Sequence, residues 1–151
     1  FLPWASSKEE KQDLYRRVLS NGGEGIMLKN LHASYLQGGR PVGNWFKAKK
    51  SATFDCVVMG FTKGKGKFND RIGAVVFGQF VNGLLTELGQ ASGMTEAVRN
   101  DMTRYPKAFI GRVVEIKGMQ RLKSGAIRHP QFLRMREDKN PRECNYYPNE
   151  R

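Results

Sequence analysis

Two lysines stand two residues apart in the segment Trp45-Phe46-Lys47-Ala48-Lys49-Lys50. If this segment is a strand, the ammonium groups of Lys47 and Lys49 project from the same face, because strand side chains alternate between faces. Like charges side by side repel unless an anion lies between them, and a phosphate is the natural anion. The same pattern is typical of a solvated basic edge strand, which protects a sheet against aggregation. The segment alone therefore leaves both interpretations open.

An acid, a glycine and a lysine mark a second segment, Glu24-Gly25-Ile26-Met27-Leu28-Lys29. A glycine beside an acid lets the backbone approach a ligand closely. As a strand, the segment would place Ile26 and Leu28 on one face, with Met27 and Lys29 on the other. Taken alone, this pattern is as compatible with ordinary structure as with a binding site.

Residues 128–139 hold four cations and two acids within twelve residues. Arg134 and Arg136 share a strand face, and their forked donors suit a polyphosphate better than point charges would. The alternative is a charge-rich surface strand whose cations are neutralised by Glu137 and Asp138. His129 has no His, Cys or acid at ligand spacing, so we expect a surface histidine and not a metal ligand.

Local signals predict the elements that carry the first two segments. Ser7 and Glu10 form a capping box at the start of a helix whose apolar residues recur at helical spacing. A polar, glycine-rich stretch predicts an exposed loop. The predicted elements are a helix over residues 6–21, strands over 25–30 and 45–49, and a loop over 33–44.

Strands dominate the rest of the chain. Asn82-Gly83 is a strong hairpin signal, and Thr95 can cap a helix that Pro106 closes. Three strands, a helix and then two strands is the order expected of an OB barrel. The predicted strands span residues 54–61, 72–80, 84–91, 112–119 and 132–136, with a basic turn over 63–67, a helix over 95–105 and a polar tail after Cys144.

Composition narrows the class of protein. The 151 residues carry 26 Lys and Arg against 14 Asp and Glu, a net charge of +12, which implies a polyanionic partner or a solvated basic surface. No window predicts a membrane span, and the N-terminus does not resemble a signal peptide. Two cysteines are too few for a disulfide scaffold or a cysteine zinc site, and Cys56 is expected to be a buried thiol. An intracellular location fits, and a start at Phe1 suggests a piece of a longer chain.

The three charged segments, in this order and spacing, resemble motifs IV, V and VI of the ATP-dependent DNA ligases. The pattern R-x-P-x-F-x-R-x-R-x-D-K over residues 128–139 carries most of the specificity. The resemblance covers about residues 14–143 and implies an α+β, mainly β fold. It implies the end of a nucleotidyltransferase domain over residues 1–52 and an OB-fold domain over 53–145, with a helix between the third and fourth of its five strands. A flexible tail would follow over 146–151.

By position, the resemblance implies a role for each charged residue, with ATP and Mg²⁺ as cofactors. Glu24 would hold the metal, and Lys29 would line the same pocket. Lys47 and Lys49 would contact the α-phosphate of ATP. The β- and γ-phosphates would be oriented by Arg128, Arg134, Arg136, Asp138 and Lys139. Catalysis of phosphoryl and nucleotidyl transfer by positioned cations agrees with these roles.

The family's nucleophile, the lysine of a K-x-[DN]-G signature, has no match in this sequence. We therefore expect a C-terminal part that cannot adenylate itself and that depends on the N-terminal part of the same ligase. Joined to that part, it would seal 3′-hydroxyl/5′-phosphate nicks in duplex DNA as a monomer, in the cytoplasm or nucleoid, or in a host cell if the protein is viral. The basic residues Lys63, Lys65, Lys67 and Arg71 would contact DNA phosphates, or would serve solubility only.

Two other functions remain open from the sequence. An mRNA-capping guanylyltransferase or an RNA ligase shares the chemistry of motifs IV and V, although the ending Arg136-Glu137-Asp138-Lys139 favours a DNA ligase. A non-enzymatic OB module could bind single strands by aromatic stacking. That module would leave the residues of motifs IV and V without a purpose.

Overall fold

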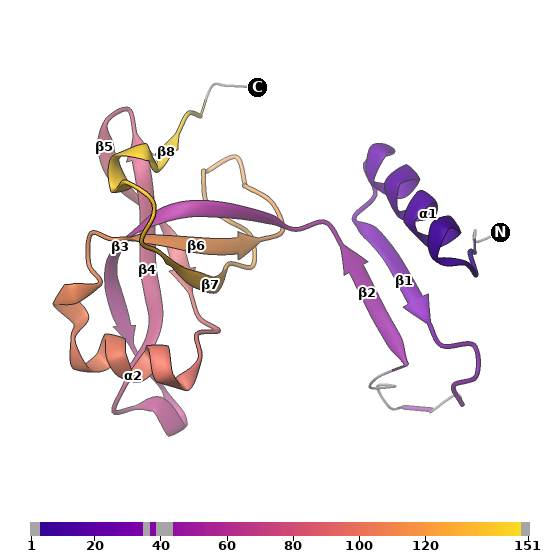
Figure 1. The fold of residues 1–151 in the computed structure, drawn as a ribbon, viewed down its shortest axis with the longest axis horizontal. Helices are drawn as coiled ribbons and strands as arrows, with labels where there is room; N and C mark the ends of the chain where they lie inside the picture. The colour runs from indigo at the N-terminus through magenta and orange to yellow at the C-terminus, as the bar shows by residue number, and fades with distance from the viewer. Residues whose placement is uncertain (1–3, 35–36, 39–43, 149–151) are drawn as a thin grey trace. The chain divides into compact units, whose positions relative to one another are not determined.

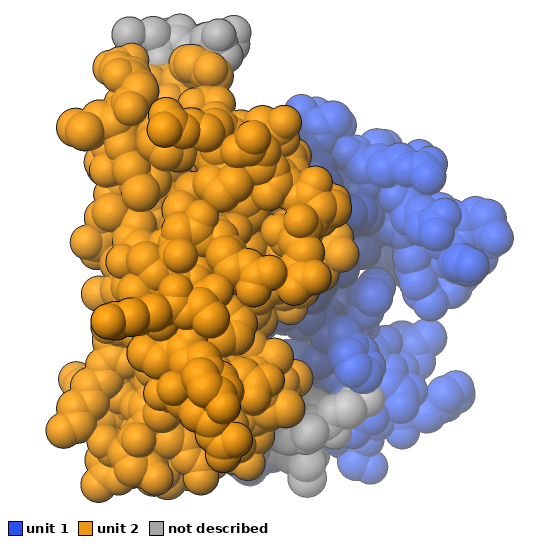
Figure 2. Space-filling model, turned by 60° about the vertical axis from the view of Figure 1, so that its left-hand side comes forward, with its two compact units in different colours: residues 1–50 blue, residues 51–151 orange. Residues whose placement is uncertain are grey.

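The computed structural model describes residues 4–34, 37–38 and 44–148. The chain divides into two compact units, residues 1–50 and residues 51–151, which Figure 2 colours separately. Part of the predicted loop over residues 33–44 lies outside the described residues, as do residues 149–151 of the predicted tail.

Unit 1 consists of one helix and a two-stranded antiparallel sheet (Figure 1). The predicted capping box is confirmed, because Ser7 Oγ accepts from the Glu10 N–H at 3.1 Å and Glu10 Oε2 accepts from the Ser7 N–H at 3.2 Å. Each of these bonds satisfies a backbone donor that the first turn would otherwise leave free. The elements are α1 (Lys8–Ser20), β1 (Gly25–Lys29) and β2 (Trp45–Lys49).

Unit 2 is an antiparallel sheet in the order β5-β4-β3-β6-β7, and α2 lies between β5 and β6 in sequence (Figure 1). Five strands with a helix between the third and fourth are the predicted OB order, which is confirmed. The strands are β3 (Ala52–Lys63), β4 (Ile72–Val81), β5 (Leu84–Ala91), β6 (Val113–Gly118) and β7 (Gln131–Arg136), and the helix is α2 (Glu96–Arg104). Three 3₁₀ turns, η1 (Gly66–Phe68), η2 (Pro106–Ala108) and η3 (Pro141–Glu143), and a short strand, β8 (Asn145–Tyr146), complete the unit.

The two ends of this sheet approach each other. Ser92, just after β5, forms a parallel bridge to Gln131 at the start of β7, and the Phe132 N–H donates to the Ser92 carbonyl at 2.8 Å. A single sheet whose outer strands meet in this way bends into the partly open barrel of an OB fold. The barrel brings the end of β5 next to β7, which carries part of the third charged segment.

Apolar side chains fill the inside of the barrel. Phe77, Val114 and Ile116 are fully buried there, and Met102 from α2 packs against the same cluster. Cys56 is fully buried, as predicted. On the other face of β3 and β6, a smaller cluster contains Val57, Val113 and Cys144. Because both faces bury apolar residues, β3 and β6 form the rigid centre of the unit.

The hairpin prediction is confirmed in detail. Asn82 and Gly83 have φ values of 52° and 79°, which is the left-handed pair that a two-residue turn of type I′ requires. The prediction of a flexible tail over residues 146–151 is wrong at residue 146, because Tyr146 lies in β8 and pairs with Val81 of β4. The guanidinium of Arg121 lies 4.1 Å from the centre of the Tyr146 ring, and this contact fixes the segment. The first barrel strand also begins at Ala52, slightly earlier than predicted.

Candidate functional site

The pairing of β1 with β2 brings the first two charged segments together. Lys29 lies opposite Trp45, Met27 opposite Lys47, and Gly25 opposite Lys49. Paired residues of an antiparallel sheet point to the same face, so Lys29, Lys47 and Lys49 share one face of unit 1. We call this the lysine face.

A carboxylate lies at one end of the lysine face. Glu24 Oε2 is 3.6 Å from Lys49 Nζ, and both side chains are substantially exposed. At the other end, Lys29 Nζ lies 4.2 Å from the centre of the Trp45 ring, a cation–π contact. Lys47, between them, has no ion pair among the residues that the structure describes. The face thus presents three cations and one acid at the surface of a short sheet.

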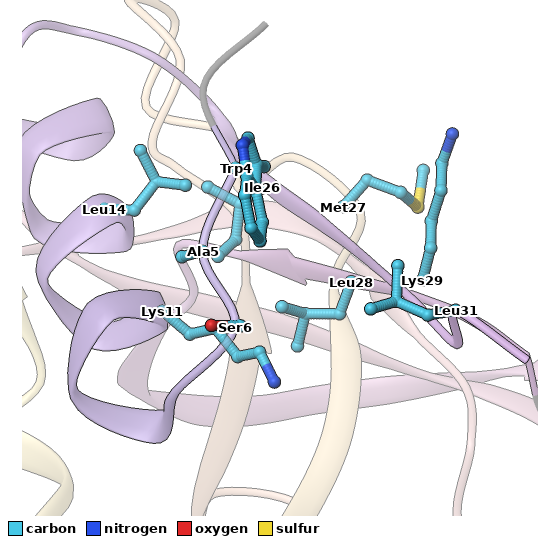
Figure 3. Close-up of a pocket in the computed structure, with 10 residues that line it drawn as sticks. All are labelled: Trp4, Ala5, Ser6, Lys11, Leu14, Ile26, Met27, Leu28, Lys29 and Leu31. Carbon is cyan, nitrogen blue, oxygen red and sulfur yellow. The ribbon is translucent and has the colours of Figure 1, made fainter.

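The opposite face of the same sheet is apolar and lies against α1. Ile26, Leu28 and Ala48 line a shallow hollow together with Tyr15 of the helix. A second hollow of about 310 Å³ opens beside it, with Trp4 and Leu14 among its lining residues (Figure 3). The helix therefore covers the apolar face and leaves the lysine face free.

Gly25 is required for the pairing itself. Its φ is +149°, and a Cβ atom built there would overlap the carbonyl oxygen of Ala48 on β2. The sequence interpretation, a glycine that lets the backbone approach a ligand, stays a prediction. This glycine lets one strand approach the other and so sets the spacing between Glu24 and Lys49.

The third charged segment lies on β7 and the turn after it, in unit 2. Arg136 makes two parallel bonds to Asp138, from Nε and Nη2, each of 2.8 Å. Arg134 Nε donates to Glu115 Oε2 of β6 at 2.6 Å. Lys139 Nζ donates to Asp55 Oδ2 of β3 at 2.9 Å.

These pairs shift ionisation equilibria in the expected directions. The two bonds from Arg136 hold the pKa of Asp138 well below its usual range. The bond to Asp55 raises the pKa of Lys139 above that of a free lysine. Asp138 and Lys139 are therefore both charged at neutral pH.

The structure brings together most of the predicted phosphate-binding residues of this segment. Their cations form ion pairs with carboxylates of the same unit. Arg128 lies in the preceding loop and is exposed, with no ion pair among the described residues. Sequence reasoning missed Asp55 and Glu115 as the partners of these cations. Each is an acid with an apolar residue on either side in its strand, which is the signal that could have identified them.

The four predicted DNA-binding residues lie on one folded loop, residues 63–71, which we call the basic loop. The Gly64 N–H donates to the Arg71 carbonyl at 2.8 Å, and the Arg71 N–H donates to the Phe68 carbonyl at 3.0 Å. The side chains of Lys63, Lys65 and Lys67 are exposed. Arg71 lies 3.7 Å from Asp70, so a carboxylate offsets part of its charge.

Helix α2 packs against the basic loop. Arg99 is almost completely buried and donates to the carbonyls of Ile72 and Gly73, and its guanidinium lies 4.4 Å from the Phe68 ring centre. Thr103 Oγ1 accepts from the Ile72 N–H at 3.1 Å. These contacts hold the end of the loop against α2.

Two features are absent from the part of the chain that the structure describes: a cluster of metal ligands and a membrane-spanning helix. No group of three or more His, Cys, Asp or Glu side chains could hold a metal ion there by itself. Glu24 is thus a single carboxylate, which fits Mg²⁺ bound jointly by a carboxylate and substrate phosphates. Nor does the described part include a helix long and apolar enough to cross a membrane.

Known proteins match the parts of the chain that carry the charged segments. A family model described as the ATP dependent DNA ligase domain matches residues 4–49, which contain the lysine face. A DNA ligase of Haloarcula marismortui is 35% identical over 91% of the chain. This chain belongs to the ATP-dependent DNA ligase family.

Further relatives extend the ligase match to both units. A DNA ligase of Methanococcoides burtonii is 31% identical over 87% of the chain. A solved structure from a study of DNA binding by Lig E DNA ligases matches 87% of the chain and 48% of its own, with a TM-score of 0.65 and 30% identity. The chain spans only 28% and 27% of the lengths of the Haloarcula and Methanococcoides ligases, in their C-terminal portion.

Proposed function

We propose that this chain is the C-terminal part of a ligase that seals 3′-hydroxyl/5′-phosphate nicks in duplex DNA at the expense of ATP. The observation that carries the proposal is the lysine face, where Lys29, Lys47 and Lys49 project together beside Glu24. In this proposal, residues 1–52 are the end of a nucleotidyltransferase domain, and residues 53–145 are the OB domain. The protein acts inside the cell as one copy.

The lysine face binds the reacting phosphate. Lys47 and Lys49 contact the α-phosphate, and Lys29, held by the Trp45 ring, lines the same pocket. Glu24 and the phosphates together hold Mg²⁺, which supplies positive charge to the phosphate oxygens. Because charge develops on those oxygens during nucleotidyl transfer, fixed cations lower the barrier more than mobile ones would.

The third charged segment binds the rest of the ATP polyphosphate. Arg128, Arg134, Arg136, Asp138 and Lys139 orient the β- and γ-phosphates as pyrophosphate leaves. Guanidinium groups suit this task because their donors form paired bonds with phosphate oxygens. The basic loop binds the DNA backbone through Lys63, Lys65, Lys67 and Arg71.

The nucleophilic lysine comes from the N-terminal part of the same ligase. No lysine in this sequence is followed by the x-[DN]-G pattern that marks the family's nucleophile. Incubation of the chain with ATP radioactive at the α-phosphate is therefore expected to give no covalent label. A band that survives denaturation and carries a lysine-linked adenylate would contradict this part of the proposal.

Binding experiments with the chain itself test the assignment to DNA ligase. Fluorescence anisotropy would compare a nicked duplex with a single strand of the same length and with capped RNA. We expect the nicked duplex to bind most tightly, because the basic loop presents its cations to a duplex backbone. A preference for the single strand would favour a non-enzymatic OB module, and a preference for capped RNA would favour a guanylyltransferase.

A further inference from the structure

Asp55 is a carboxylate that the proposed reaction does not use, although it contacts two residues of the third charged segment. It lies on β3 between Phe54 and Cys56, and its side chain is 22% exposed. Its two oxygens accept from different cations. Oδ1 is 3.3 Å from Arg136 Nη1, and Oδ2 is 2.9 Å from Lys139 Nζ.

Asp55 differs from the other main partner of Arg136 in its place along the chain. Asp138 follows Arg136 by two residues, and its side chain is 67% exposed. When the segment moves or its side chains rotate, Asp138 travels with Arg136. Asp55 belongs to the rigid central strand of the barrel, so its bonds must break if Arg136 and Lys139 are to leave the sheet.

The charges of this cluster are balanced within the unit. Three carboxylates, Asp55, Glu115 and Asp138, pair with three cations, Arg134, Arg136 and Lys139. An incoming polyphosphate therefore meets cations that already have partners. It must exchange with those carboxylates, and their negative charges also repel it.

We propose that Asp55 is a latch, a positioning residue that holds Arg136 and Lys139 on the barrel and competes with the polyphosphate for them. The proposal rests on the proposed function, because it assumes that these cations bind the β- and γ-phosphates. When a polyphosphate binds, each cation exchanges a carboxylate oxygen for a phosphate oxygen, and Asp55 stays on β3. The free chain thus keeps its cations ordered and neutralised until the polyphosphate arrives.

The substitution Asp55→Asn tests the latch, with inorganic tripolyphosphate as the probe and isothermal titration calorimetry of the 151-residue chain as the assay. Asparagine keeps the size of the side chain, and the backbone carbonyl that accepts from Gln79 is unchanged. The ion pairs of Asp55 are partly exposed, and we expect the loss of such a pair to change the affinity by up to about a factor of five. We therefore expect D55N to bind tripolyphosphate about threefold to fivefold more tightly.

Asp101→Asn is the matched control. It removes the same charge from the same unit, and Asp101 is exposed and has no ion pair in the described part of the chain. D101N measures the effect of net charge alone, and we expect it to change the affinity less than D55N. Equal effects of D55N and D101N, or weaker binding by D55N, would overturn the latch.

A third variant separates the failure of the latch from the failure of the proposed function. Arg136→Gln is expected to weaken tripolyphosphate binding. If R136Q binds as tightly as the unmodified chain, the polyphosphate site itself is wrong. If R136Q weakens binding and D55N does not strengthen it, only the latch is wrong.

A side-chain measurement without any ligand completes the test. The Lys139 pKa, followed by carbon NMR of its ε-methylene group, is expected to fall in D55N because the hydrogen bond that Lys139 donates to the Asp55 carboxylate is lost. D101N is expected to leave it unchanged. A Lys139 pKa that does not move in D55N would show that this contact is not made in solution, and the latch would be refuted.

Discussion

The basic loop allows a quantitative prediction about DNA binding. Each phosphate that a cation neutralises releases counterions, so that log K falls against log salt with a slope of about −0.9 per phosphate. In this loop Lys63 and Lys65 are exposed and have no ion pair among the described residues. Lys67 keeps its charge but contacts the Phe68 ring at 4.9 Å, and the charge of Arg71 is partly offset by Asp70. Lys63 and Lys65 are therefore the two residues that we expect to contribute fully.

The double substitution K63A/K65A removes both. We expect the slope to become less steep by about 1.8. Between about 50 and 200 mM salt, the loss of affinity should therefore be about twelvefold smaller for the double variant than for the unmodified chain. The assay is fluorescence anisotropy on a nicked duplex at four or more salt concentrations. The fold should be unaffected, since both side chains are exposed.

The control is K107A/K123A, which removes the same charge from two exposed lysines outside the loop. If DNA binds at the basic loop, the control leaves the slope nearly unchanged. Equal changes in slope for the two double variants would mean that DNA binds diffusely to a chain of charge +12, and the role of the loop would be refuted. A flat salt dependence of the unmodified chain would refute it more directly.

Three further predictions concern stability and reactivity. R134M leaves the carboxylate of Glu115, whose side chain is 11% exposed, without its partner. It should lower the free energy of unfolding in urea by about 1–2 kcal/mol, whereas E115Q/R134M should recover most of the loss. G25A places a Cβ atom against the Ala48 carbonyl and should disrupt the NMR signals of β1 and β2, whereas G60A, at a position with open space, should leave them intact. Burial raises the pKa of Cys56 to about 12 and that of Cys144 to about 11, so a thiol reagent at about pH 8 should label neither in the folded chain and both after unfolding. Rapid labelling of Cys56 in the folded chain would contradict its burial.

Most of the elements could be predicted from local sequence alone. The capping box of Ser7 and Glu10 and the turn at Asn82-Gly83 depend on residues only a few positions apart, and both are confirmed. The alternation of apolar and polar residues predicted the strands to within a few residues. Such signals act through neighbouring backbone groups, so they can be recognised in the sequence without knowledge of the fold.

The prediction of a flexible tail is wrong at Tyr146 because the position of this residue depends on distant parts of the chain. Tyr146 follows a polar stretch and carries no local strand signal. Its place in β8 depends on β4 and on the guanidinium of Arg121, which are 65 and 25 positions away in the sequence. A contact made across such separations leaves no pattern in the residues next to it.

For the charged residues too, some features follow from local sequence and others depend on contacts between distant segments. Local sequence specifies which residue types are available, places Lys47 and Lys49 on one strand face, and sets an order of residues that resembles that of the DNA ligases. The three-dimensional fold places Lys29 opposite Trp45 on that same face, because strand register depends on the pairing of distant segments. It also decided that Arg136 and Lys139 meet Asp55, more than 80 residues away in the chain. Charges attract through space and not along the sequence, so the pairing of Arg136 and Lys139 with Asp55 was set by the folding of the barrel.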